Sequence, residues 1–583
     1  MGLGGIKDSP RKMAVLCALV LLAVNLLLYA ETLRFGFLKD DHVLVENNPR
    51  VKSGKVFLDT LDKRFFAFPD FPFLHYWRPL TLLSYRIDYL LWGPDPKGFH
   101  LANVLINAAV AVLVLLFFLA WSGRAIPAFL VAMWFSLFPL HAENVAWISG
   151  RPDLLAALFV LPAALAFLRF LDSGRKLFLL LTLLFFVPGL LVKESLALFP
   201  VIALAMTWMR GQWRRGRVPL AGLALVSVLF GFLHAAVSGS GGMLARASVS
   251  QAPLVFQTIG VYARMILVPV FPDPYFSMAR FEAGPLEWSA WAVAALVILA
   301  LVVWKKNRWT FSSGALGFLA LMLPLLNPEL VPSTPQLAMR FVYLPAVFGG
   351  ALLVDLGSRL DRRWKPVLIT FAVVAGFALA AVNRVYQDYF HNDEVFFSRL
   401  IPSYPQDGLL LLPMALKRAT EKRYAEALDL ARRGAEISSR GRWADTREMA
   451  ALLEANVLLV TGDPEAGFRL AQRIQRETGQ DGMRFKALLI QAKYHEMRRD
   501  YVRSLVALEQ AEALGNTAEL YLQRCLVLAK TGRSREALAA MEKARALNPD
   551  LTDFSALSRI LRGGGEAQIG EGSPQPAPLR RGE

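Results

Sequence analysis

The feature that most constrains this chain is a series of apolar blocks, most of them about long enough to cross a lipid bilayer. A spanning helix needs about 20 predominantly apolar residues. With 55% hydrophobic residues and a mean hydropathy of +0.40, the chain is predicted to be a polytopic membrane protein. The blocks lie at 13–30, 100–121, 125–140, 154–171, 177–192, 195–209, 218–237, 253–271, 287–304, 310–326, 337–357 and 366–382.

Basic residues in the short connections predict the orientation of these blocks, because Arg and Lys are retained in the cytoplasm. As far as the block at 218–237, they occur at the N-terminus and on every second connection. The later clusters at 305–308 and 359–365 keep this alternation only if the block at 253–271 re-enters from the outer face instead of crossing. We therefore expect eleven spans, a cytoplasmic N-terminus and a C-terminal part that is periplasmic or otherwise extracytoplasmic, in a multi-pass protein of a cell inner membrane.

The net charge of +17 does not indicate a nucleic-acid partner, since much of the excess lies in these loops. The two cysteines, Cys17 and Cys525, fall in different parts of the chain. They therefore predict neither a disulfide framework nor a cysteine-based metal site.

After about residue 406 the composition changes to Ala, Leu, Glu, Arg and Lys with helical periodicity. Four units of paired helices can be traced, with equivalent Ala or Ser positions 39, 38 and 33 residues apart. A period of about 34 residues is typical of tetratricopeptide repeats, and a generic helical-hairpin domain is the alternative. The predicted all-α chain thus has a membrane helix bundle at 1–390, a connector at 391–408, an α-solenoid of repeats at 409–562 and a disordered tail at 563–583.

Charged clusters occur in the loops that this topology places outside. The acidic pair Asp40–Asp41 follows the first span directly, and carboxylates at the edge of the hydrocarbon layer are costly enough to indicate function. Each cluster alone is explained by a solvated turn, a hairpin ion pair or an anchor to head groups. Together they supply a carboxylate that can deprotonate a hydroxyl group and cations that can hold a leaving phosphate. The other clusters contain Arg78, His100, His141, Glu143, Arg151, Asp153, Lys193 and Arg340.

Taken in order, these clusters resemble the transmembrane and tetratricopeptide-repeat O-mannosyltransferases and their bacterial relatives. The segment from His141 to Arg151, His-Ala-Glu-Asn-Val-Ala-Trp-Ile-Ser-Gly-Arg, is the most specific part of the resemblance. That family belongs to the GT-C class of glycosyltransferases, which use polyprenyl-phosphate-linked sugars. The resemblance implies such a donor, a protein or glycan acceptor that the repeats bind, contact with membrane lipid, and inversion at the sugar.

Carried over by position, the resemblance makes Asp40 and Asp41 the acidic motif of the first outer loop, with Asp40 preferred as the catalytic base. The residues assigned to the acceptor or donor site are His141, Glu143, His100 and Asp153. The residues assigned to bind the donor phosphate are Arg340, which is favoured, and Arg78, Arg151 and Lys193. No metal ligands and no cofactor are assigned, and a need for a divalent cation stays open.

The leading hypothesis is therefore a membrane glycosyltransferase, with mannose as the candidate sugar. Two other classes stay open. One is a non-catalytic, membrane-anchored repeat scaffold for cell-envelope assembly. The other is a lipid-carrier transporter in which Arg340 and Arg264 handle phosphate.

Overall fold

The computed structural model consists of helices and turns, with no strand among the residues it describes. The chain divides into two compact units, one formed by residues 1–46 and 77–399 and the other by residues 47–76 and 400–583. Most of the predicted span at 310–326 and the predicted tail at 563–583 lie outside the described residues. The described segments are 10–52, 77–238, 252–305, 310, 337–440, 444–461 and 463–547, with single positions at 554, 558 and 561.

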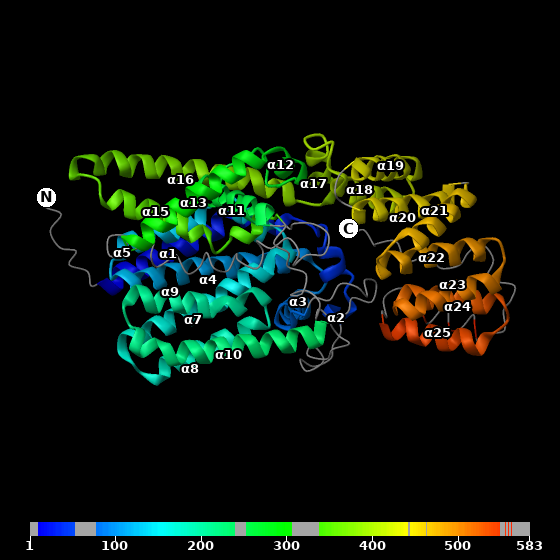
Figure 1. Ribbon diagram of the computed structural model, residues 1–583, viewed down its shortest axis with the longest axis horizontal. Coiled ribbons are helices and arrows are strands. Elements are labelled where there is room, and N and C mark those ends of the chain that lie inside the picture. The colour runs from blue at the N-terminus through cyan, green and yellow to red at the C-terminus, as the bar shows by residue number, and fades with distance from the viewer. Residues whose placement is uncertain are drawn as a thin grey trace. The chain divides into compact units, whose positions relative to one another are not determined.

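The N-terminal unit is a bundle whose long helices run in roughly the same direction (Figure 1). Short helical turns connect several of them. The α-helices are α1 (Pro10–Leu28), α3 (Pro79–Trp92), α4 (Pro96–Ser122), α5 (Ala125–Leu137), α6 (His141–Ala146), α7 (Arg151–Ser173), α8 (Lys176–Leu190), α9 (Phe199–Arg210), α10 (Trp213–Ser238), α11 (Ala252–Leu267), α12 (Met278–Ala283), α13 (Pro285–Trp304), α15 (Ala346–Ser358), α16 (Lys365–Gln387) and α17 (Asp393–Leu400).

Among the described residues, 5 helices are long and apolar enough to cross a membrane. They are α4, α10, α13, α7 with the turn before it, and α16 with the turns that flank it. Four more helices, α1, α5, α8 and α15, are apolar but only 10–17 residues long over their apolar part. The chain is a membrane protein by these features, whereas the count of eleven spans and the re-entrant path of α11 stay predictions.

Several helices are shorter than the apolar blocks that predicted them, and prolines account for part of the difference. The helix α5 ends at Leu137, two residues before Pro139, whereas α8 contains Pro188 and ends at Leu190. Proline lacks an amide hydrogen and disfavours helix in the residue before it. The polar loops therefore begin earlier than hydropathy alone indicates.

The bundle has inner and outer helices. Burial covers 72% of the apolar window in the α7 segment and 56% of that in α4, but only 6% of that in the α16 segment. Large side chains such as Phe371 and Phe377 are 68% and 75% exposed on α16. A helix that is apolar on its exposed face is suited to lipid rather than to water, so α16 is an outer, lipid-facing helix of the bundle.

A buried polar network joins the helices that support the outer loops. Asn25 of α1 donates to Ser136 of α5 at 2.9 Å, and Asn107 of α4 donates to Asn25 at 2.8 Å. The hydroxyl group of Tyr343 donates to Asn107 at 2.6 Å. Such bonds between membrane helices each contribute about 0.6–2 kcal/mol. They fix the loop that contains Arg340 and Tyr343 relative to α1, α4 and α5.

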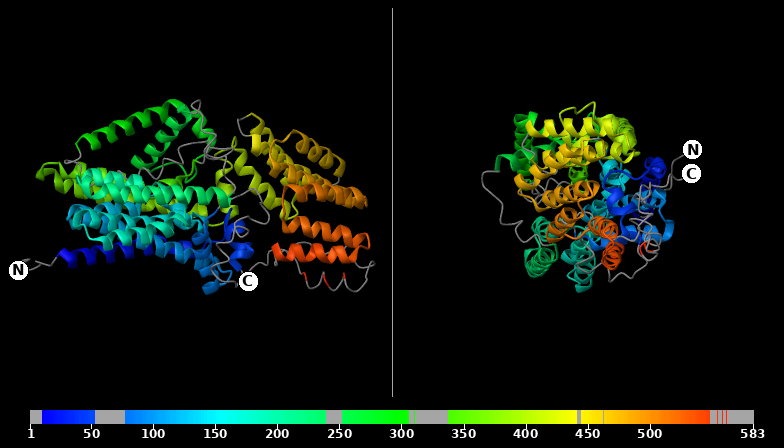
Figure 2. Two further views of the ribbon diagram at one scale, coloured as in Figure 1. Left: turned by 60° about the horizontal axis from the view of Figure 1, so that its bottom comes forward. Right: turned by 90° about the vertical axis from the view of Figure 1, so that its right-hand side faces the viewer.

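The C-terminal unit contains a row of helices coloured yellow to red in Figure 2. Each helix packs against the next, and α18, α20, α22 and α24 also contact one another in order. This packing is typical of a helical-repeat solenoid, while the assignment to the tetratricopeptide class stays a prediction. The helices are α18 (Gly408–Thr420), α19 (Tyr424–Arg440), α20 (Ala444–Thr461), α21 (Pro464–Glu477), α22 (Asp481–Met497), α23 (Tyr501–Leu514), α24 (Ala518–Lys530) and α25 (Ser534–Leu547), and the short α2 (Pro49–Lys52) belongs to the same unit.

Candidate active site

The two members of the acidic pair have opposite environments, and Asp41 is the buried one. Its Oδ2 accepts a hydrogen bond from the amide of Leu38 at 3.0 Å. Its Oδ1 accepts two more from Ser149, from the amide at 2.7 Å and from the hydroxyl group at 2.5 Å. Burial raises the pKa of Asp41 to about 7, although the hydrogen bonds from Ser149 and Leu38 oppose the shift. Asp41 therefore anchors the first outer loop to the turn at Ile148–Gly150.

Asp40, in contrast, is exposed. Its carboxylate forms no hydrogen bond or ion pair with the part of the chain that the structure describes. Its charge nevertheless acts on Lys39, Asp41 and Arg340, so these groups share one electrostatic neighbourhood. Of the two carboxylates, Asp40 is the one free to accept a proton from a bound hydroxyl group.

Lys39 belongs to the same site, although it was not predicted from the sequence. Its ammonium group lies 4.8 Å from the ring centroids of both Trp147 and Phe396. Burial lowers the pKa of Lys39, although the charges of Asp40 and Glu143 oppose the shift. The only signal in the sequence was its place directly before the acidic pair.

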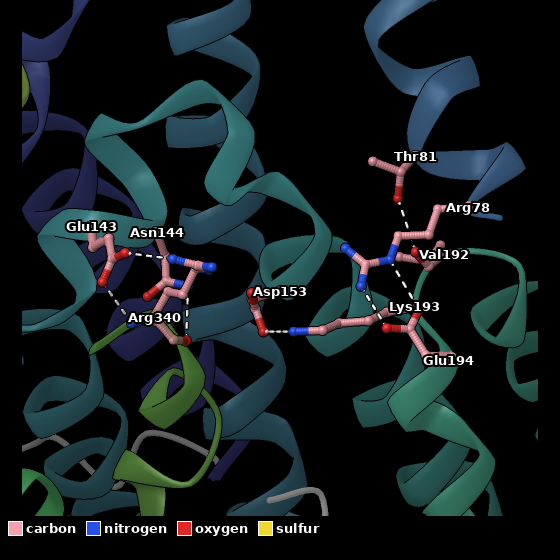
Figure 3. A network of polar contacts seen from close by, with 9 residues as sticks. All are labelled: Arg78, Thr81, Glu143, Asn144, Asp153, Val192, Lys193, Glu194 and Arg340. Carbon is pink, nitrogen blue, oxygen red and sulfur yellow. Dashed lines mark hydrogen bonds and ion pairs between the residues drawn. The ribbon is translucent and has the colours of Figure 1, made fainter. Parts of the chain in front are cut away.

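Glu143 and Arg340 form the ion pair whose cation is best suited to bind a phosphate group. The carboxylate of Glu143 accepts from Nη1 of Arg340 at 2.9 Å and from its backbone amide at 2.8 Å. Asn144 donates to the carbonyl oxygen of Arg340 at 3.1 Å (Figure 3). The guanidinium lies 5.2 Å from the ring centroid of Trp147, and the Arg340 side chain is 23% exposed. Among the described residues only Nη1 of this guanidinium has a polar partner, so Nε and Nη2 are available to a ligand.

Two further ion pairs continue from the first, as Figure 3 shows. Lys193 reaches Asp153 of α7 at 2.5 Å, and its side chain is only 5% exposed. Arg78 donates from Nε at 2.9 Å and from Nη2 at 2.5 Å to the two carboxylate oxygens of Glu194. Burial alone would raise the pKa of Glu194, but the charge and hydrogen bonds of Arg78 outweigh it and lower the pKa to about 2. Both cations are thus held by carboxylates of their own.

Arg151, His141 and His100 lie deeper in the bundle. All three side chains are fully buried. Arg151 contacts Asp88 at 2.5 Å, Asn103 at 2.7 Å and the carbonyl oxygen of Phe99 at 2.8 Å, so each guanidinium nitrogen has a partner in α3 or α4. A role of Arg151, His141 and His100 in substrate binding remains a prediction from the sequence.

The two histidines pack against backbone and rings. Nε2 of His141 is 2.9 Å from the carbonyl oxygen of Tyr343, and burial lowers the pKa of His141 to about 3. His141 is therefore neutral at pH 7 and donates this hydrogen bond. Nε2 of His100 lies 3.4 Å from the carbonyl oxygen of Gly36.

Among the residues that the structure describes, no group of three or more His, Cys, Asp or Glu side chains is arranged to hold a metal ion. The need for a divalent cation stays open. The arrangement consists of one carboxylate without a partner among the described residues, a partly exposed guanidinium on which its charge acts, and a row of paired charges.

No protein-family model matches the chain. Part of the chain is similar to proteins named protein O-mannosyl-transferases. It is 34% identical to mouse TMTC1 over 194 residues, which is 30% of this chain and 20% of that protein. The match to Tmtc2 of Drosophila melanogaster has 31% identity over 223 residues, 35% of this chain and 23% of that protein. The match to mouse TMTC4 has 31% identity over 170 residues, 26% of this chain and 23% of that protein.

The chain therefore spans about a fifth of the length of these relatives, 20–23%. Over the matched part, the similarity supports the relationship to these proteins that the motifs indicated.

Proposed function

We propose that this protein transfers a sugar from a polyprenyl-phosphate carrier to a hydroxyl group of a protein, or to a glycan, on the extracytoplasmic side of the membrane. The relatives are named protein O-mannosyl-transferases, which favours mannose as the sugar and protein as the acceptor. The observation that carries the proposal is the exposed carboxylate of Asp40, which has no partner among the described residues, in the same electrostatic neighbourhood as the partly exposed guanidinium of Arg340.

In this proposal Asp40 is the general base. It takes the proton of the acceptor hydroxyl group while that oxygen attacks the anomeric carbon of the sugar. The bond from the anomeric carbon to the phosphate oxygen breaks in the same displacement, so the configuration at the anomeric carbon inverts. A positioned base of this kind contributes about 10²–10⁴-fold to the rate.

Arg340 is the proposed ligand of the donor phosphate. As polyprenyl phosphate leaves, the negative charge on its oxygens grows, and a guanidinium that is already in place stabilises that charge without reorganisation. Glu143 orients Arg340 through two hydrogen bonds and leaves Nε and Nη2 for the phosphate. Arg78 has a comparable exposure of 23%, which suits it to the outer part of the donor site.

The scaffold and transporter hypotheses remain the alternatives, and a transfer assay separates them from the proposal. The purified full-length protein in lipid nanodiscs is incubated with radiolabelled polyprenyl-phosphate mannose and a pool of serine- and threonine-containing peptides. We expect labelled peptide and released polyprenyl phosphate. The Asp40→Asn variant should lose about 10²–10⁴-fold in rate, whereas Asp361→Asn, a change in an exposed ion pair with Arg363, should not alter the rate.

Full activity in both the Asp40→Asn variant and the Asp40→Asn/Asp41→Asn double variant would refute this assignment. Glycoproteomics of a strain that lacks the protein adds the acceptor, because a sugar lost from one protein identifies both the activity and its target. A deletion that leaves every protein glycan in place favours the scaffold or the transporter.

A further inference from the structure

Asp393, the first residue of α17, contacts the chain on both sides of the acidic pair. Its Oδ1 accepts a hydrogen bond from the amide of Lys39 at 2.9 Å, and its Oδ2 lies 2.8 Å from Nε2 of His42. Only Asp40 and Asp41 stand between these two residues. A single carboxylate 351 or more positions away in the chain therefore spans the whole acidic turn.

Lys39 has a backbone conformation that needs such support. Its φ of 53° lies in the left-handed region, which residues other than glycine rarely occupy. Conformations of this kind persist where the surroundings over-determine them, and they cluster at functional sites. The amide that donates to Asp393 belongs to this same residue, and the next residue along the chain is Asp40.

His42 supplies the second attachment. Its Nδ1 lies 2.5 Å from a carboxylate oxygen of Glu46, while its Nε2 faces Asp393. Burial alone would lower the pKa of His42, but the hydrogen bonds to Asp393 and Glu46 outweigh it and raise the pKa to about 10. The ring is therefore an imidazolium at neutral pH and donates to a carboxylate on each side.

Further contacts between the region of α17 and the first outer loop reinforce this attachment. The amide of Gly36 donates to the carbonyl oxygen of His391 at 2.9 Å. The ring of Phe396, one turn into α17, lies under the ammonium group of Lys39. Asn392 caps the start of α17 by accepting from the amide of Val395 at 3.0 Å, so the Asp393 carboxylate is not required for that task.

We propose that Asp393 is a positioning residue for the base: it holds Lys39 in the left-handed conformation and His42 in place, and so aims Asp40 at the acceptor. This inference rests on the proposed function. Asp393 touches none of the reacting atoms and acts through the turn. Asp393 begins α17, and α17 ends at Leu400, where the C-terminal unit begins. Asp393 therefore lies on the segment of the chain that leads from the N-terminal unit into the C-terminal unit.

The first test measures kcat and KM for polyprenyl-phosphate mannose with the full-length protein. Asp393→Ala should lower kcat by about 10- to 100-fold, the effect of a small misplacement of a catalytic group, with little change in KM. Asp393→Asn, which keeps an acceptor for the Lys39 amide, should lose less. Asp388→Asn is the matched control, because Asp388 precedes α17 by a few residues and pairs only with Arg384, at 3.1 Å, among the described residues.

The second test asks whether Asp393 acts through Lys39. Glycine enters the left-handed region without the steric cost of a side chain, so Lys39→Gly should make the turn less dependent on Asp393. The fold-loss caused by Asp393→Ala should therefore be smaller in the Lys39→Gly background than in the wild type. Losses that multiply independently would overturn the proposal.

Amide hydrogen exchange across residues 38–44 gives a readout that needs no activity. Asp393→Ala should exchange faster there and Asp388→Asn should not. If the wild-type protein transfers no sugar but exchange rises in Asp393→Ala, the proposed function fails while the attachment of the turn stands. If exchange is unchanged, or if it rises while kcat stays at the wild-type value, the positioning role is wrong.

Discussion

Replacing each member of the acidic pair by asparagine separates their roles, because the two carboxylates differ in burial and in the hydrogen bonds that they accept. Asp40 is exposed, and its carboxylate forms no hydrogen bond or ion pair with the described residues. Its replacement should therefore change the free energy of unfolding by no more than about 0.5 kcal/mol. The same replacement removes the proposed base and should lower the rate of transfer by about 10²–10⁴-fold.

Asp41→Asn should have the opposite profile. If the new amide oxygen keeps both hydrogen bonds from Ser149, the amide nitrogen faces the N–H of Leu38, and an orphaned buried donor costs about 1–3 kcal/mol. The two retained bonds change from charge-assisted to neutral, a loss of about 1 kcal/mol each. Because the pKa of Asp41 is raised to about 7, removal of a buried, partly ionised group offsets some of this. We expect a net loss of stability of about 2–4 kcal/mol.

Thermal unfolding followed by intrinsic fluorescence, together with transfer rates per folded molecule, distinguishes the two profiles. Asp40→Asn should unfold at the wild-type temperature and be inactive, whereas Asp41→Asn should unfold earlier and keep activity in its folded fraction. The reasoning is refuted if Asp41→Asn is as stable as the wild type and inactive while Asp40→Asn is active. That result would make Asp41 the base.

Other predictions concern the cations, the charged histidine and the topology. Arg340→Gln should raise the donor KM and lower kcat together, with a smaller effect of Arg340→Lys, and unchanged constants would contradict a role in phosphate binding. Arg151→Gln should destabilise the protein by about 3–5 kcal/mol, because it leaves the carboxylate of Asp88 buried and unpaired; an inactive variant of normal stability would show that Arg151 acts on substrate instead. The pKa of His42 is raised from 6.5 to about 10, so its stabilisation should be complete below pH 6.5 and be lost as the pH rises through 10; the unfolding temperature of His42→Gln, followed over that range, should lack this decline. A reporter fused after Leu400 should be active outside the cytoplasm, and cytoplasmic activity would overturn the proposed topology.

Much of the helical framework was predictable, because a long apolar block has few other stable solutions in a bilayer. In the C-terminal unit α19, α21, α23 and α25 begin at Tyr424, Pro464, Tyr501 and Ser534, which are 40, 37 and 33 residues apart and so follow the spacing of 39, 38 and 33 residues found in the sequence. Helix ends in the membrane unit were less predictable. The apolar block continues through Pro139, whereas the helix α5 ends before it.

The partners of the site residues were not predictable from sequence. The ion pair of Arg78 with Glu194 joins positions 116 apart, and the contact of Lys39 with Asp393 joins positions 354 apart. No periodicity carries information over such separations. For the same reason the sequence could not distinguish Arg151, which is enclosed by α3 and α4, from Arg340, which keeps part of its guanidinium exposed.

The carboxylate beside each candidate cation has a consequence for selectivity under the proposed function. A membrane surface presents many anionic head groups, and a bare cluster of Arg and Lys would retain any of them. Arg340, Lys193 and Arg78 are each paired with a carboxylate that balances their charge, so a single head group gains little from any one of them. Only a ligand that binds several positions at once, as a phosphate joined to a sugar can, gains enough to stay. The ion pairs then make the site selective for a scarce lipid donor over the abundant anionic lipids around it.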